Sequence, residues 1–226
     1  MMRVVKIIIL AAALMATGCA NSPPGSVSGG RRLVVQMQVA GEIRSDYYYY
    51  FAIDTSGNPL DGPEAVVGPP NGWGAGKITH YVQVHGGAFS LWKVLGTAPR
   101  LNDQNIGQPR NFAFPAPNTL WFVIDLDQLD LPPPPIGSSQ TIEVNFITTD
   151  DGSIPNPGQV IPRRWDALGD LSSSTFFSLP LIPGASFSNG SAGGIETEGD
   201  VQDEARNVVD NPNLDIVDWS IELQQQ

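Results

Sequence analysis

The chain has 226 residues and a formal net charge of −11 at pH 7, with Asp and Glu nearly twice as numerous as Lys and Arg. Such an acidic chain is a poor partner for nucleic acid, whose phosphates are bound by Lys and Arg. Its only cysteine, Cys19, excludes an intramolecular disulfide, so packing and hydrogen bonds have to stabilise the fold. Frequent Gly and Pro, sparse charge and short runs of Val, Ile, Tyr and Phe are typical of a secreted all-β domain.

Residues 1–18 have the pattern of a secretion signal. Arg3 and Lys6 precede an unbroken apolar run over residues 7–16, and small residues follow it. This run is about half the ~20 residues that a membrane-spanning helix needs. We therefore expect a signal segment that is removed from the mature chain.

The signal ends in Ala16-Thr17-Gly18-Cys19, which resembles the lipobox of bacterial lipoproteins. The resemblance implies cleavage after Gly18, a diacylglyceryl group on the Cys19 thiol and a fatty acyl group, such as palmitate, on the new amino terminus. It also implies a place in the cell envelope outside the cytoplasmic membrane, because two or more acyl chains anchor a protein stably. Ala20 follows the cysteine where lipoproteins kept at the inner membrane often have Asp, so the resemblance implies the outer membrane in a cell with two membranes. The alternative is an ordinary signal peptide with a coincidental cysteine.

Residues 19–32 form the lipidated cysteine and a flexible tether, because small and polar residues bury too little surface to order themselves. Over residues 33–226 we expect one antiparallel β-sandwich with long loops, since short alternating runs recur between turn signals. The expected strands are 33–39, 47–54, 78–85, 88–95, 119–126, 141–148 and 214–223, with single helical turns at 163–168 and 201–209. The predicted core residues are Val35, Phe51, Ile53, Val82, Val144, Phe146 and Trp219.

A calcium site is predicted in the loop that follows the second strand. Five oxygen-bearing side chains fall within eleven residues there, and calcium prefers six to eight oxygen ligands. The alternative is a turn whose Asp, Ser and Asn side chains cap backbone amides. The candidate ligands are Asp54, Ser56, Asn58, Asp61 and Glu64.

Trp73 follows in a glycine-rich stretch, where a tryptophan can remain exposed and bind a ligand by stacking. Tyr48 and Tyr50 share one face of the second strand and would extend such a platform for a glycan. The alternatives are that Trp73 folds back over the sandwich and that the tyrosines belong to a strand covered on both faces.

Catalytic motifs are weak in this sequence. His80 and His85 are five residues apart on an expected strand, so they should point to opposite faces and cannot share a metal. A Gly-x-Ser-x-Gly elbow is absent. A hydrolase with paired carboxylates would need two acids that face each other at a defined gap. Its candidates are Asp54, Asp61, Glu64, Asp125, Asp127, Asp130, Asp150 and Asp151.

The segment from Tyr47 to Pro59 resembles the strand and turn of secreted β-sandwich modules of the ninth carbohydrate-binding family and the DOMON type. In those modules an aromatic strand followed by Ala-x-Asp-Thr-Asp-Gly-Asn is frequent, and Ser56 stands here where an Asp is common. The resemblance covers thirteen residues and implies a sandwich, without identifying binding residues.

These patterns favour a membrane-anchored lipoprotein with a non-enzymatic binding role, for a glycan or a calcium-linked ligand. Calcium is the one candidate cofactor. The alternative is a structural envelope component that docks a protein partner through a sheet face or edge, and a carboxylate-dependent hydrolase is a third hypothesis.

Overall fold

The computed structural model describes residues 30–65, 72–96, 102–132, 134, 138–154, 156, 159, 162–170, 173–192, 194–203 and 205–225. The predicted signal peptide, Cys19 and most of the predicted tether lie outside these residues. Among the described residues, no helix has the length and apolar character that would be needed to cross a membrane.

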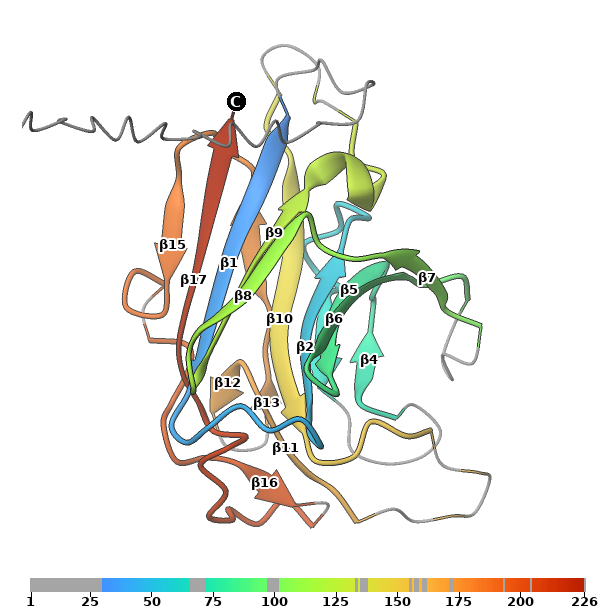
Figure 1. The fold of residues 1–226 in the computed structure, drawn as a ribbon. Helices are drawn as coiled ribbons and strands as arrows, with labels where there is room; N and C mark the ends of the chain where they lie inside the picture. The colour runs from blue at the N-terminus through green and yellow to red at the C-terminus, as the bar shows by residue number, and fades with distance from the viewer. Residues whose placement is uncertain are drawn as a thin grey trace, which may run out of the picture.

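Two antiparallel sheets lie face to face and form a β-sandwich, as the sequence predicted (Figure 1). The smaller sheet has five strands in the order β15–β17–β1–β9–β8. Its strands are β15 (Ser186–Ser188), β17 (Ile216–Gln225), β1 (Arg31–Val39), β9 (Thr119–Asp125) and β8 (Asn111–Ala116).

The larger sheet has eight strands in the order β16–β11–β10–β2–β5–β6–β7, and β14 pairs with β10 beside this path. Its strands are β16 (Gln202–Asp203), β11 (Arg164–Ala167), β10 (Thr141–Thr149), β2 (Tyr48–Asp54), β5 (His80–His85), β6 (Ala88–Lys93), β7 (Gln104–Gly107) and β14 (Phe177–Pro180). Two short pairs, β3 (Pro63–Ala65) with β4 (Gly74–Gly76) and β12 (Gly169–Asp170) with β13 (Ser173–Ser174), and a 3-10 helix, η1 (Leu126–Leu129), complete the fold.

Alternating apolar residues of the long strands form the core between the two sheets. On β1, Leu33, Val35, Met37 and Val39 are buried, whereas the residues between them are half-buried. The seven core residues predicted from the sequence are all buried: Val35, Phe51, Ile53, Val82, Val144, Phe146 and Trp219. The period-two pattern thus located this core, because each of these strands buries one face against the opposite sheet.

The larger sheet also buries its outer face. Tyr50 and Ala52 of β2 pack there against Trp73, Tyr81 and Ile147 in a second apolar cluster. The β3–β4 pair covers this face, together with Trp73 and Ile78. β2 is therefore a strand covered on both faces, which explains why both of its faces are apolar or aromatic.

The two predicted helical turns are wrong. Residues 164–167 form β11, which pairs with β10 through Ile147 opposite Ala167 and Thr149 opposite Trp165. Residues 202–203 form β16, which pairs with β11 in turn. The free edge of β10 offers backbone hydrogen bonds that an isolated helical turn does not have, and short helices are marginal in water.

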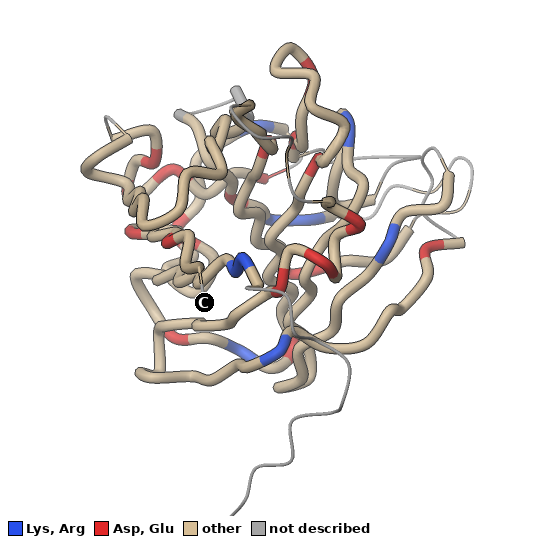
Figure 2. Tube along the Cα trace, turned by 90° about the horizontal axis from the view of Figure 1, so that it is seen from above, with Lys and Arg blue, Asp and Glu red and all other residues tan. Residues whose placement is uncertain are grey.

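The two ends of the sandwich differ in what they carry. Arg31 pairs with Gln225, so the described chain begins and ends at one end of the molecule (Figure 1). The connections over residues 40–47, 86–87 and 117–118 lie at the opposite end, which we call the distal end. Asp and Glu, which outnumber Lys and Arg in the sequence, are spread over many segments of the molecule (Figure 2).

Candidate ligand-binding site

The residues of the predicted calcium loop are engaged mainly in local caps. Asp54 is fully buried, and its Oδ1 accepts the Ser56 N–H at 3.0 Å while its Oδ2 accepts the Ser56 hydroxyl at 2.5 Å. Asn58 Oδ1 accepts the Leu60 N–H at 3.2 Å. Asp61 and Glu64 are exposed. In this arrangement the side chains of Asp54 and Asn58 stabilise the turn, which is the alternative that the sequence left open.

An acid that the sequence reasoning missed lies beside Asp54. Glu143 of β10 is opposite Asp54 in the strand register, both side chains are fully buried, and neither oxygen of Glu143 has a hydrogen-bond partner. Burial raises the pKa of Glu143 to about 7, and the charge of Asp54 adds to the effect. The signal in the sequence was a single acid between Ile142 and Val144. Because both carboxyls are enclosed, this pair does not offer two acids to a substrate in a cleft.

The other carboxylates considered for catalysis are largely engaged in ion pairs. Asp125 forms ion pairs with Arg32 and Arg110, with N···O distances of 2.7 and 2.9 Å. Asp130 forms an ion pair with Lys93, with an N···O distance of 2.6 Å. Asp150 likewise pairs with Arg164 at 2.9 Å. These contacts connect strands and loops, so Asp125, Asp130 and Asp150 each have a structural role.

The rings of the predicted stacking platform pack against the protein. Trp73 is 6% exposed and stacks on Tyr50, with ring centroids 3.8 Å apart and planes 7° apart. Tyr50 is 2% exposed, and Tyr48 stacks on His85 with centroids 3.8 Å apart. Trp73 thus folds back onto the outer face of the larger sheet, so Trp73 and Tyr50 present no free ring to a glycan.

The two histidines point to opposite faces of β5, as predicted. His80 is buried on the side of Val82 and Val84, and its Nδ1 lies 3.1 Å from the Thr79 hydroxyl. Burial lowers the pKa of His80. His85 lies on the other side against Tyr48, at the last residue of the strand.

A pocket of about 320 Å³ opens at the distal end, and we call it the distal pocket. Its walls come from three parts of the chain that are far apart in sequence: the β1–β2 connection, the end of β5 and the β8–β9 hairpin. The side chains that define its chemistry are Glu42, Ile43, Arg44, His85, Phe114 and Pro117. Ligand sites in proteins start at about 300 Å³, so the volume suits a small molecule or one unit of a polymer.

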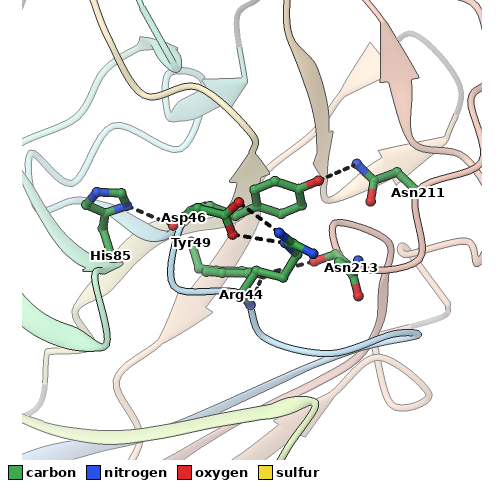
Figure 3. A network of polar contacts seen from close by, with 7 residues as sticks. Arg44, Asp46, Tyr49, His85, Asn211 and Asn213 are labelled. Atoms are coloured by element: carbon green, nitrogen blue, oxygen red, sulfur yellow. Dashed lines mark hydrogen bonds and ion pairs between the residues drawn. The ribbon is translucent and has the colours of Figure 1, made fainter.

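A polar network fixes the β1–β2 connection that forms one wall of this pocket (Figure 3). Arg44 makes a two-pronged ion pair with Asp46 at 2.9 and 2.8 Å. The Arg44 N–H donates to the Tyr49 hydroxyl at 2.9 Å, and that hydroxyl donates to the Asn213 carbonyl at 3.0 Å. The hydrogen bond and charge of Arg44 hold the pKa of Asp46 below its ordinary value. The wall is therefore held in place before any ligand arrives.

His85 and Phe114 supply the opposite side of the pocket. His85 Nδ1 lies 3.0 Å from the Tyr47 carbonyl oxygen, which orients the ring. Phe114 is 41% exposed and contacts Phe89 with ring centroids 5.2 Å apart. Sequence reasoning missed this site because no local motif marks it: its residues meet only when three connections converge at one end of the sandwich.

Comparisons with protein-family models, curated proteins and solved structures find no match to this chain.

Proposed function

We propose that this chain is a lipid-anchored lipoprotein, exposed outside the cytoplasmic membrane, that binds a glycan at the distal pocket without catalysis. The proposal moves the predicted glycan site from Trp73, Tyr48 and Tyr50 to the distal pocket, because the rings of Trp73 and Tyr50 are covered. The observation that carries it is a preformed pocket of about 320 Å³ that combines an exposed ring, Phe114, with charged groups.

The position of the pocket supports the anchoring part of the proposal. Cys19 precedes β1 by about a dozen residues, and β1 starts at Arg31 at the end away from the pocket. A domain held through that end would present the distal pocket away from the membrane, toward polymers of the envelope.

The chemistry of the pocket supports a glycan. A sugar ring has an apolar face that stacks on an aromatic ring, here Phe114. Its hydroxyl groups hydrogen-bond to charged side chains, here Glu42 and Arg44, and bonds to charged groups are stronger than neutral ones. Glu42 is the one acid among the described residues that line this pocket, whereas a hydrolase with paired carboxylates uses two facing acids.

Lipidation is tested by Cys19→Ser. Processing and fatty-acid labelling should both be lost, because the thiol is the acceptor of the diacylglyceryl group. Normal labelling of the variant with a fatty-acid probe would overturn the anchor.

Glycan binding is tested by a glycan array followed by titration calorimetry with the best glycan. Phe114→Ala should abolish binding, whereas the matched change Phe112→Ala should leave it intact. Both rings are 41% exposed and both contact Phe89, but only Phe114 lines the pocket. Retained binding in Phe114→Ala would exclude the distal pocket.

A second candidate function is docking of a protein partner, and a specific observation favours it. β8 is the edge strand of the smaller sheet and exposes Phe112 and Phe114. Free edges pair readily with another chain, although Pro115 within β8 limits such pairing. Loss of partner binding in both Phe112→Ala and Phe114→Ala would favour this function, since a glycan in the pocket needs only Phe114.

A further inference from the structure

Three acids that no sequence motif marked converge at the distal end of the sandwich interior. Asp166 of β11, Glu196 and Asp200 each place a carboxylate oxygen within 4.8 Å of the others. They are 2%, 6% and 5% exposed. Asp166 of β11 pairs with Thr148 of β10, and its side chain lies on the face toward the smaller sheet. There its Oδ2 accepts a hydrogen bond of 2.6 Å from the backbone N–H of Ile216 in β17. The cluster therefore lies where the two sheets meet.

The unpartnered carboxyl group of Glu196 favours a ligand at this cluster. Both of its oxygens are enclosed and have no hydrogen-bond partner, although the side chain is more than nine-tenths buried. Its backbone is fixed, because its N–H donates to Asn189 Oδ1 at 3.1 Å and its carbonyl accepts Asn189 Nδ2 at 3.2 Å. An ionised carboxylate left unpaired in the interior is very costly, so buried charges are paired or coordinate metals.

Asp166 and Glu196 lie in a negative environment. Among the described residues, no Lys, Arg or His side chain forms an ion pair with Asp166 or Glu196. Asp215 adds to the negative field: burial and then Asp166, Asp200 and Asp215 raise the pKa of Glu196 to about 11. Burial and then Asp200 raise the pKa of Asp166 well above its ordinary value. Protonation or a bound cation would relieve the repulsion between Asp166 and Glu196.

The chain neighbours of Asp200 line a pocket of about 200 Å³. Gly199 and Val201 are in its lining, together with Asp215. The Gly199 N–H donates to Asp215 Oδ1 at 2.8 Å, which fixes the turn that leads into Asp200.

We propose that Asp166, Glu196 and Asp200 bind one Ca²⁺ ion at the distal end. The three oxygens lie within 4.8 Å of one another. One calcium ion could contact all three, since each oxygen ligand of calcium lies 2.3–2.6 Å from the metal. The donors are hard oxygens without His or Cys, which selects calcium or magnesium over zinc. Calcium fits better, because magnesium keeps several waters and rarely occupies a buried all-protein cage.

The ion would join three segments distant in sequence: β11, the connection that carries Glu196 and Asp200, and the first residue of β17, which Asp166 holds. This site differs from the loop of Asp54, Asp61 and Glu64, whose acids do not form a metal-binding group among the residues described by the structure.

The test uses the purified protein after treatment with a chelator. Calcium should raise the melting temperature in a concentration-dependent way and give a binding isotherm by titration calorimetry. Terbium should replace calcium and luminesce when tryptophan is excited, because Trp165 is adjacent to Asp166. Glu196→Gln should abolish all three responses, and in chelator it should melt no lower than the wild-type protein, because Gln has nearly the same shape and is neutral without binding a proton.

Glu198→Gln is the matched control, since Glu198 is exposed and lies two residues away. It should keep the full calcium response. Asp200→Asn provides a second test that does not depend on the stability of the Glu196 variant. A wild-type protein without a calcium response, a stronger response to magnesium, or an unchanged response in Glu196→Gln and Asp200→Asn would each overturn the proposal. If the calcium response were lost in Asp61→Ala and retained in Glu196→Gln, the proposal would also be overturned. The ion would then belong to the loop after β2.

Discussion

The interior of the sandwich has two parts that differ in how they are stabilised. In the middle, apolar side chains from both sheets bury one another, and Phe146 contacts both Phe51 and Trp219 with ring centroids 5.0 and 5.7 Å apart. At the distal end, Asp166, Glu196 and Asp200 occupy the space between the sheets. The middle needs no additional component, whereas the acidic end requires protons or a cation.

This difference shows that one fold can combine a self-sufficient core with an end whose order depends on the medium. Burial of apolar area stabilises the middle at any calcium concentration. The acidic end gains stability only when its charges are neutralised.

The largest effect should come from Phe146→Ala in the middle of the core. Phe146 is 1% exposed, and truncation of such a side chain costs about 3–5 kcal/mol. Denaturant unfolding should show this loss equally with calcium and with chelator. A loss below about 1 kcal/mol would place Phe146 outside the core.

Calcium should stabilise the acidic end by a smaller amount. At a free concentration of about 100 times the Kd, a ligand that binds only the native state adds about 2.7 kcal/mol. Hydrogen exchange should slow around Gly199 and Ile216 when calcium is added, because those amides donate to Asp215 and Asp166. For β1 and β9, the rate of amide exchange through local opening should be the same with and without calcium. If calcium instead slowed exchange equally at all amides, the two parts of the interior would not be distinct.

Glu143, on the outer face of the larger sheet, should make the free energy of unfolding depend on pH. Its folded pKa, about 7, lies above the ordinary value of 4.5, so the folded state binds more protons than the unfolded state between these values. The stability from this group is fully present below pH 4.5 and is lost as the pH rises through 7. Glu143→Gln should therefore flatten part of the fall in melting temperature between pH 5 and 8. An identical pH profile in the variant would show that Glu143 does not titrate in this range.

The smallest effect should come from Ser56→Ala, which removes one hydrogen bond to the buried Asp54. The expected cost is about 1 kcal/mol, measured by denaturant unfolding. This cost should be the same with and without calcium, because the Asp54 oxygens serve the turn. A cost that appears only with calcium would instead indicate that the loop after β2 binds the ion.

Much of the fold could be predicted from the sequence, but the candidate sites could not. Alternation on β1 and β17 was a local signal, and it located Val35 and Trp219 in the core. β11 was missed because Arg164–Ala167 has no pattern of its own and becomes a strand only beside β10. The distal pocket and the acidic cluster depend on contacts between segments that are far apart in the chain. Glu196 is not distinguishable in sequence from its exposed neighbour Glu198, because burial is a property of the tertiary fold.

The pairing of Arg31 with Gln225 has a mechanical consequence. β1 is hydrogen-bonded along its length to β17 on one side and β9 on the other. A pull on residue 31 against the distal end loads these bonds together in shear, whereas a pull that separates residues 31 and 225 opens the β1–β17 ladder one pair at a time. Optical tweezers should therefore record a higher unfolding force in the first geometry. A lipoprotein held through the start of β1 and loaded at its distal pocket would be pulled in its more resistant direction.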